Sequence, residues 1–368
     1  MDPKNGNGSA VQNSVKTFDP RVESLAQKIR LAKLPEELLE KANSMIARLQ
    51  LISHESGFLI EFDNISRYID WICSLPWNNK TTDVLDLKHA QMVLDKNHYG
   101  LTDVKQKILE YLSIMIYKSA QGKDLNESFA RAPIISLVGL VGVGKTTVAY
   151  SIAESLGRKI ERIPFGGMGG AQMLRGQSRF NPEAEPGFII KALKRAGTNN
   201  PVFLLDEIDR VSEEARGDIM GVLVELLDPE QNRSFVDHYI DFPVDLSNVL
   251  FIATSNNTKD ISTAVLDRLE LIQMPSYSDQ EKIVIAKNYM FPKILVESGM
   301  SLKDIVVEDS AWEDIVRPLG YDSGIRSLKR TVEGMVRRVA LFTLEGKIPK
   351  GQLFRVNREN IKVLVPQW

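Results

Sequence analysis

Cysteine is nearly absent from this chain: Cys73 is the only one among 368 residues. A single cysteine excludes an internal disulfide and any metal cluster built on several cysteine ligands. Its neighbours in "WICSLPW" are mostly apolar, so we interpret Cys73 as a small residue of the core. The chain also lacks an excess of charge, with 46 basic and 48 acidic residues, and no overall basic field therefore exists to attract nucleic acid.

Long apolar runs are missing as well. The longest, "PIISLVGLVGVG", is too short and too rich in glycine to span a bilayer. Residues 1–18 are rich in asparagine, glycine and serine, and they lack the apolar core of a secretory signal and the arginines of a transit peptide. We expect them to form a disordered tail, and we expect a cytoplasmic protein that does not associate with membranes.

Residues 19–90 carry the pattern of a helical segment. In "LPEELLEKANSMIARLQLI" apolar residues recur every three or four positions from Leu38 to Leu49. We expect a second helix in "FDNISRYIDWICSLPW", ended by Pro76, and a third in "DLKHAQMVLDKNHYG", closed by Gly100. A fourth helix is predicted in "LTDVKQKILEYLSIMIY".

Strands and helices then alternate over residues 91–275. The runs "APIISLVGL", "PVFLLDEID" and "NVLFIATSNN" are typical of buried parallel strands. Helices such as "KTTVAYSIAESLG" lie between them, and this alternation predicts an α/β fold with a doubly wound parallel sheet. Residues 276–368 are mostly helical in pattern, and we predict a small lid domain closed by one short strand, either "QLFRV" or "IKVLV".

The segment "GLVGVGKT" matches the spacing of a phosphate-binding loop. Its glycines allow backbone N–H groups to turn inward around a phosphate, and the following helix adds the positive end of its dipole. Lys145 supplies a charge to the β- and γ-phosphates, and Thr146 supplies a hydroxyl to Mg²⁺. The predicted nucleotide contacts of this loop are Gly139, Leu140, Val141, Gly142, Val143, Gly144, Lys145, Thr146 and Thr147.

Polar residues follow two of the predicted strands. "FLLDEID" places Asp206 at a strand end, where it can hold Mg²⁺, and Glu207 beside it as a base or polariser of water. An Asp-Glu pair at a strand end is also common as a helix cap. Asn256 ends the third strand and can bond the attacking water or the γ-phosphate, although a turn asparagine is the alternative.

These residues together resemble the AAA+ portion of the Lon family of ATP-dependent proteases. The resemblance is carried by "LPWNNKTTDVLDLKHAQMVLDKNHYGLTDVKQKILEYL", "LVELLDPEQNRSFVDHYIDFPVDLSNVLFIATSNN" and "GIRSLKR", and it covers nearly everything after residue 20. It implies a P-loop AAA+ fold, preceded by an N-terminal helical segment and followed by an α-helical lid, with ATP and Mg²⁺ as cofactors.

The resemblance also implies roles for individual residues and for the assembly. The implied roles are Walker B for Asp206 and Glu207, sensor one for Asn256, arginine finger for Arg268, sensor two for Arg326, and adenine contacts for Tyr99 and Gly100. A finger that acts on a neighbouring subunit's nucleotide implies a homo-oligomeric ring, hexameric in the family. Spacing alone does not decide whether Arg268 and Arg326 are functional or ordinary surface arginines.

The sequence departs from the family pattern in three places. Leu140 and Val141 replace the usual prolines of the phosphate loop. The family's serine–lysine protease domain follows the lid, whereas this sequence stops at "IKVLVPQW", so we expect no peptidase activity from it. The departure with most consequence is in "RGQSRFNPEAEPG", where Asn181 and Pro182 replace the aromatic–aliphatic pair with which the family grips polypeptide. Phe180 is displaced by one residue from that pair, and Glu183 and Glu185 add negative charge to the loop.

Two functions of different kinds follow from these features. The first is an ATPase motor that unfolds and translocates unfolded or damaged proteins, with Phe235 and Tyr239 of a second pore segment available for apolar contact. The alternative is a protease-free regulatory or assembly subunit with a degenerate pore loop. A nucleic-acid motor has little support, because "LKRTVEGMVRR" is the only basic helical stretch, although DNA binding by Lon relatives makes weak DNA binding a further expectation.

Overall fold

The computed structural model describes residues 19–53, 57–120, 134–179, 181, 183–317, 324–349 and 351–365. The expected tail at residues 1–18 lies outside them. By its internal contacts the chain divides into two units, Met1–Asn78 and Asn79–Trp368, and each is considered on its own. The domain limits expected at residues 90 and 275 stay predictions. Within the described residues, no helix has the length and apolar composition required to cross a bilayer.

The first unit is a group of three helices, α1 (Pro20–Leu31), α2 (Glu36–Leu51) and α3 (Phe58–Ser74), which all contact one another. Asp19 caps α1 by accepting a hydrogen bond from the backbone N–H of Arg21 at 2.9 Å. The buried residues recur at helical spacing: Val22, Leu25 and Ile29; Leu38, Ala42, Ile46 and Leu49; Ile65, Ile69 and Ile72. The helices predicted in this segment are confirmed, and α3 ends just before Pro76 as expected.

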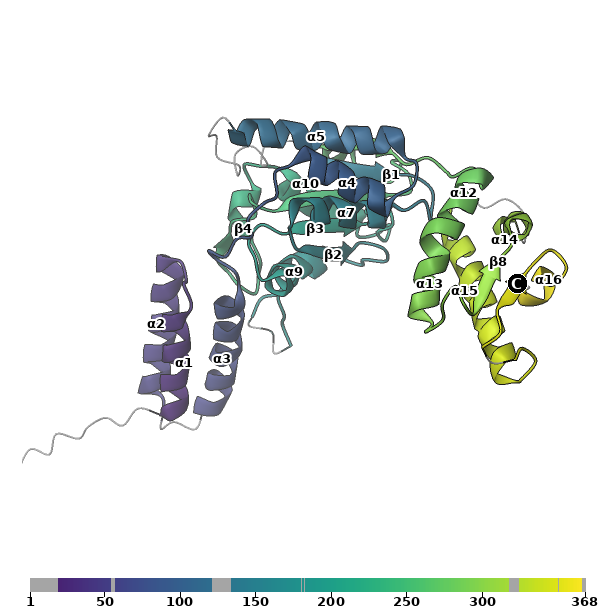
Figure 1. Cartoon of the computed structure of the whole chain (residues 1–368). Helices are drawn as coiled ribbons and strands as arrows, with labels where there is room; N and C mark the ends of the chain where they lie inside the picture. The colour runs from purple at the N-terminus through teal and green to yellow at the C-terminus, as the bar shows by residue number, and fades with distance from the viewer. Residues whose placement is uncertain are drawn as a thin grey trace, which may run out of the picture. The chain divides into compact units, whose positions relative to one another are not determined.

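The second unit contains a five-stranded parallel sheet (Figure 1). Its strands, in the order β2-β3-β6-β1-β7, are β2 (Ile160–Pro164), β3 (Val202–Asp206), β6 (Leu250–Ser255), β1 (Ile134–Val138) and β7 (Leu269–Gln273). The connections run through α7 (Lys145–Leu156), α9 (Phe188–Ala196), α10 (Arg216–Leu227) and the short α11 (Thr263–Leu266). The doubly wound parallel sheet predicted from the sequence is confirmed.

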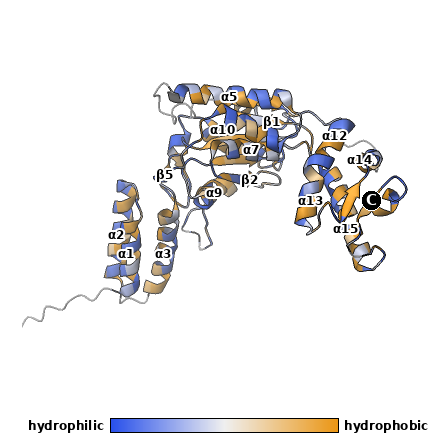
Figure 2. Cartoon of the chain, in the orientation of Figure 1, coloured by the Kyte–Doolittle hydropathy of each residue, from blue (hydrophilic) through white to orange (hydrophobic). Residues whose placement is uncertain are grey.

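Side chains on both faces of the sheet are buried, which explains the continuous apolar runs of its central strands. Leu204 and Ile252 join a core that also contains residues of α4 (Leu87–Asn97), α5 (Thr102–Ala120) and α7. Phe203 and Phe251 alternate with them on the other face, with ring centroids 6.0 Å apart. Figure 2 shows that α5 carries both hydrophilic and hydrophobic residues. The helix expected to close at Gly100 ends earlier, since α4 stops at Asn97.

The edge strands β2 and β7 were not predicted. Each has one neighbouring strand, and several of its residues face water. Glu161 and Arg162 therefore interrupt the apolar pattern of β2, and Glu270 interrupts that of β7. Shorter elements of this domain are α8 (Gln172–Arg175), η1 (Asn232–Ser234) and a hairpin of β4 (Phe235–Val236) with β5 (Pro243–Val244).

The lid begins with an almost continuous helix of α12 (Asp279–Ile285), a π-helical turn η2 (Ala286–Met290) and α13 (Phe291–Glu297). It continues through β8 (Ile305–Val307), η3 (Asp309–Ala311), α14 (Trp312–Val316), α15 (Arg326–Leu344), β9 (Phe354–Val356) and α16 (Ile361–Leu364). Its core is built around Trp312, which packs edge-on against Phe291. "QLFRV" contains the predicted strand, β9, whereas "IKVLV" forms α16, and the partner strand β8 was not predicted.

Candidate active site

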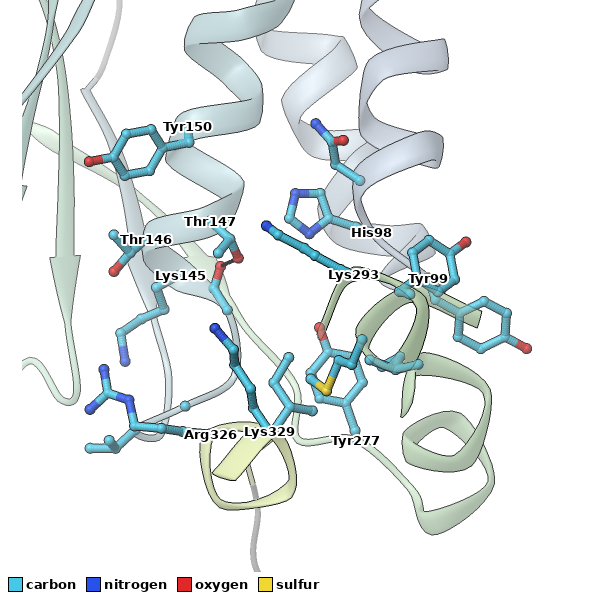
Figure 3. A pocket seen from close by; sticks show the side chains of 18 of the residues that line it. His98, Tyr99, Lys145, Thr146, Thr147, Tyr150, Tyr277, Lys293, Arg326 and Lys329 are labelled. Atoms are coloured by element: carbon cyan, nitrogen blue, oxygen red, sulfur yellow. Dashed lines mark hydrogen bonds between the residues drawn. The ribbon is translucent and has the colours of Figure 1, made fainter. Parts of the chain in front are cut away.

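A cavity of about 590 Å³ lies where β1, β3 and β6 end, and residues of the lid close it from the other side (Figure 3). Ligands of doubly wound folds bind at this edge, because the loops that follow parallel strands gather there. The predicted site residues that line the cavity are Tyr99, Val141, Gly142, Gly144, Lys145, Thr146, Thr147, Asp206, Glu207, Asn256 and Arg326. Among the described lining residues, five side chains are cationic and three are carboxylates, so the cavity favours an anion.

The phosphate loop joins β1 to α7. Gly142 and Gly144 have φ of +84° and +96°, a region that side chains with a Cβ rarely adopt, so these two positions need glycine. Gly144 is the N-cap of α7 and Lys145 is its first residue, which directs the N–H groups of this helix at the cavity. The loop can therefore bind an anion through its backbone.

Three predicted loop residues do not line the cavity. Gly139 is needed for packing, because an added Cβ would lie 2.7 Å from the backbone oxygen of Met274. Val143 is fully buried and anchors the loop in the core, whereas the side chain of Leu140 is largely exposed. Sequence spacing identified the loop as a unit but did not separate the residues that contact a ligand from those that support them.

Lys145 is 8% exposed and joins the loop to the end of β6. Its ammonium donates to the backbone oxygens of Gly139 at 2.6 Å and Leu140 at 3.0 Å, and to Oδ1 of Asn256 at 3.1 Å. Burial lowers the pKa of Lys145, and the nearby carboxylates, chiefly that of Asp209, oppose this effect. Lys145 and Asn256 thus meet although they are far apart in sequence.

Asp206 and Glu207 are organised by the hydroxyl of Thr254, a residue that no sequence motif predicted to belong to the site. This hydroxyl donates to Oδ1 of Asp206 at 2.5 Å and accepts from the N–H of Glu207 at 2.9 Å. Thr254 can reach both because β3 and β6 are adjacent and parallel. Glu207 has a φ of +58°, a strained backbone for a residue with a side chain, and such strain is concentrated at functional sites.

Asn256 follows β6 and stands beside the end of β3, as predicted. The carboxylate of Asp209 fixes this turn by accepting from the N–H groups of Asn256 at 3.0 Å and Asn257 at 3.2 Å. Within the described part of the chain, Nδ2 of Asn256 is buried and has no hydrogen-bond partner. A buried donor of this kind, at the wall of a cavity, is suited to a phosphate oxygen or a water held beside one.

The oxygen groups of the cavity fit a magnesium ion. Thr146 contributes a hydroxyl and Asp206 a carboxylate, and oxygen ligands are those that Mg²⁺ prefers. The described residues contain no group of three or more His, Cys, Asp or Glu side chains able to hold a metal alone. At phosphate sites Mg²⁺ is held by one or two protein ligands together with water and phosphate oxygens.

The lid contributes cations to the cavity. Arg326 is the first residue of α15 and Lys329 lies one turn later, and Figure 3 shows Lys329 and Lys293 extending toward the phosphate loop. The lid also touches this loop through its backbone: the N–H of Ile325 donates to the oxygen of Gly142 at 3.0 Å. A Cβ on Gly324 would lie 2.7 Å from the oxygen of Val141, so this contact needs glycine.

Aromatic residues line the opposite end of the cavity. The rings of Tyr99 and Tyr289 lie 6.4 Å apart, and Tyr289 belongs to the π-helical turn of the lid. His98 is buried beside them, with Nε2 2.8 Å from Oγ of Ser151. Gly100 does not line the cavity but has a φ of +64°, which turns the chain after Tyr99. This end offers flat rings suitable for a base.

Arg268 is not part of this cavity. It precedes β7, at the amino-terminal edge of the sheet, and its Nη2 pairs with Oδ2 of Asp228 at 3.0 Å. A five-residue strand is about 16 Å long, so this arginine lies far from the phosphate loop of its own chain. A role in hydrolysis would have to be exerted on another subunit.

The segments expected to grip polypeptide are partly described. Phe180 and Pro182 lie outside the described residues, and Asn181 is exposed. The expectation that Phe235 and Tyr239 are available for contact is wrong, because they are 0% and 5% exposed. Phe235 packs under the guanidinium of Arg175 at 5.8 Å, and Asp237 accepts the N–H groups of Gly187 and Tyr239. This segment is held against its own domain.

Several lining residues carried no recognisable sequence signal. They are Asn97, His98, Tyr150, Arg162, Tyr277, Tyr289, Lys293 and Lys329. Tyrosines and lysines at these positions resemble any amphipathic helix face, and Arg162 occupies an edge strand that was itself missed. Only the tertiary arrangement brings them to the cavity.

Known proteins resemble this chain along most of its length. Residues 135–277 match the family described as "ATPase family associated with various cellular activities (AAA)". The Lon protease of Lawsonia intracellularis is 40% identical over 344 residues, which cover 94% of this chain and 40% of the relative. The Lon protease of Dictyoglomus thermophilum is 41% identical over 350 residues, covering 94% and 43%. Lon protease 1 of Bacillus subtilis is 43% identical over 320 residues, covering 87% and 40%.

Proposed function

The chain belongs to the Lon family of AAA+ ATPases, and from this premise we propose that it hydrolyses Mg-ATP to unfold and translocate protein substrates. It spans about two fifths of the length of the relatives it matches, so the activity, substrates and partners of a whole Lon protein belong to the proposal. The observation that carries the proposal is the meeting of the phosphate loop, Asp206, Glu207 and Asn256 around one cavity.

In this proposal each residue acts on a defined part of the nucleotide. The N-terminus of α7 and Lys145 bind the phosphates through N–H groups and charge. Thr146 and Asp206 hold Mg²⁺, which neutralises charge on the β- and γ-phosphate oxygens when it is bound. Glu207 orients and polarises the attacking water, and Nδ2 of Asn256, which has no hydrogen-bond partner among the described residues, holds that water or the γ-phosphate.

The lid and the base site complete the same pocket. Arg326 approaches the phosphates from α15, and the rings of Tyr99 and Tyr289 receive the adenine. Arg268 serves the nucleotide of a neighbouring subunit in a homo-oligomeric ring, a hexamer in this proposal. Its place at the opposite edge of the sheet supports action in trans, and its release from Asp228 would accompany assembly.

The test compares two variants with one control. Lys145→Ala should abolish binding of Mg-ATP in calorimetry, because it removes the charge at the phosphate loop. Glu207→Gln should keep binding and lower phosphate release by about 10²–10⁴-fold. Glu213→Gln, an exposed carboxylate after the same strand, should change neither quantity. Normal turnover by Glu207→Gln would exclude the role given to this carboxylate.

Protein translocation is tested by stimulation of turnover. The relatives named above are all called Lon protease, which favours a motor over a regulatory subunit. An unfolded protein such as casein should raise the ATPase rate of the wild type. If it does not, and Asn181→Tyr with Pro182→Ile creates stimulation, the regulatory alternative is the better account.

Weak DNA binding is the remaining element of the proposal. Arg337 and Arg338 are exposed on α15 and provide a small basic patch. A duplex shift assay at increasing salt should show binding that weakens with ionic strength, and Arg337→Gln with Arg338→Gln should remove it.

A further inference from the structure

The guanidinium of Arg162 pairs with Asp206, the carboxylate that is proposed to hold the metal. Its Nε and Nη2 both lie 2.6 Å from Oδ2 of Asp206, while Thr254 donates to Oδ1 of the same carboxylate. Both oxygens of Asp206 are therefore bonded to protein donors. The side chain of Asp206 is 6% exposed and that of Arg162 is 52% exposed, so a half-exposed arginine pairs with a buried carboxylate.

The placement of Arg162 distinguishes it from the other arginine pair of this strand. Side chains alternate along β2, and Glu161 points away from the cavity to pair with Arg195 of α9 at 2.7 Å. Arg162 instead lines the cavity together with Asp206 and Glu207. The two pairs use the same chemistry, and only one of them blocks a proposed ligand position.

Charge balance explains why a cation is needed at this position. Asp206, Glu207 and Asp209 are close together, and Lys145 is directed to the phosphate loop and to Asn256 rather than to these carboxylates. A buried carboxylate without a partner is costly, because burial removes its water. A half-exposed arginine can fill the position and leave it again, since about half of its side chain already faces solvent.

We propose that Arg162 is a placeholder for the divalent cation: it holds Asp206 while no metal is bound and must leave this carboxylate before Mg²⁺ or Mn²⁺ can be bound through it. The inference rests on the proposed ATPase function and adds a positioning residue to it.

Asp206 can bind a metal only while Arg162 is away from it. The apparent metal affinity is therefore the intrinsic affinity multiplied by the fraction of time for which Asp206 is free. Removing the guanidinium should therefore tighten Mn²⁺ binding, by about fivefold for a partly exposed pair of ordinary strength. Binding of ADP without any metal should change less than twofold, because Arg162 is bonded to Asp206 in that state.

The experiment measures Mn²⁺ binding to the ADP-loaded protein by electron paramagnetic resonance, and ADP binding in EDTA by calorimetry, both at pH 8. The variants are Arg162→Gln and Arg162→Lys, and the matched control is Arg195→Gln, which breaks the neighbouring pair with the same change of charge. Circular dichroism and the melting temperature establish that each variant is folded; Arg162→Lys provides a folded form if Arg162→Gln is not.

We expect tighter Mn²⁺ binding in Arg162→Gln, a smaller gain in Arg162→Lys and no change in Arg195→Gln. Unchanged or weaker Mn²⁺ binding in both Arg162 variants would overturn the inference, as would an equal change in metal-free ADP affinity, which would assign Arg162 to the phosphates instead. Failure of the wild type to bind ADP in either condition is a different result, and it would exclude the proposed function itself.

Discussion

His98 makes the stability of this protein sensitive to mild acid. His98 is 8% exposed, and burial, aided by the charge of Lys105, lowers the pKa of His98 to about 4. In the unfolded chain the same ring has a pKa of about 6.5. Below that pH the ring binds a proton in the unfolded state but stays neutral in the folded state. The contribution of His98 to the free energy of unfolding is therefore fully present above about pH 7 and is lost as the pH falls toward 4.

The two pKa values set the size of the effect. At pH 5 the unfolded state gains about 2 kcal/mol from this one proton, and the loss approaches about 3 kcal/mol below pH 4. His98→Gln removes the titrating ring and keeps a polar group near Ser151, which lies 2.8 Å from the histidine ring. The variant should therefore lose about 2 kcal/mol less than the wild type between pH 7.5 and pH 5.

Urea unfolding of the wild type and His98→Gln at these two pH values gives the difference directly, and exposed His238→Gln serves as the control. The chain contains four histidines, so NMR of labelled rings can also follow the titration of each one. Equal losses of stability in the wild type and in His98→Gln, or a His98 ring that titrates above about pH 6 in the folded protein, would refute this reasoning.

Three further changes probe other parts of the fold. Gly324→Ala should weaken ADP binding about tenfold in calorimetry, because its Cβ would meet the oxygen of Val141 at 2.7 Å and push the lid from the phosphate loop. Asp83→Ala should lower the free energy of unfolding by about 3 kcal/mol in urea titrations, since it removes the carboxylate that pairs with the buried Arg158 guanidinium at 2.6 Å. Gly221→Ala, inside α10 with open space around its Cβ, should raise that free energy by about 0.5–1 kcal/mol and leave ADP affinity unchanged. An unaltered affinity in Gly324→Ala, an unaltered stability in Asp83→Ala, or a destabilised Gly221→Ala would each contradict the contact invoked.

Local sequence patterns were sufficient for the central strands and for the phosphate loop. β1, β3 and β6 are buried on both faces, and their apolar runs are unbroken for that reason. The edge strands β2 and β7 escaped because charged residues face water there. The "IKVLV" segment, equally apolar, forms a short helix, since burial of Ile361 and Leu364 in the lid decides its conformation rather than strand propensity.

The site was predictable where chemistry is concentrated in one short stretch. Lys145, Thr146, Asp206 and Glu207 are identified by motif, and their convergence follows from the parallel order of the strands. Thr254 and Asp209 orient these groups from neighbouring positions, and single hydroxyl or carboxylate residues of this kind are common in any sequence. Arg162 reaches Asp206 only through the pairing of β2 with β3, which no periodicity signals.

The hydrogen bond between Ile325 and Gly142 ties the start of α15 to the phosphate loop, so a movement of this loop can tilt the helix. The 19 residues of α15 extend for about 28 Å. A tilt of about 5° at its first residue would displace the last residue of a helix of this length by about 2.5 Å. A small shift of the phosphate loop would therefore become a larger displacement at the far end of α15.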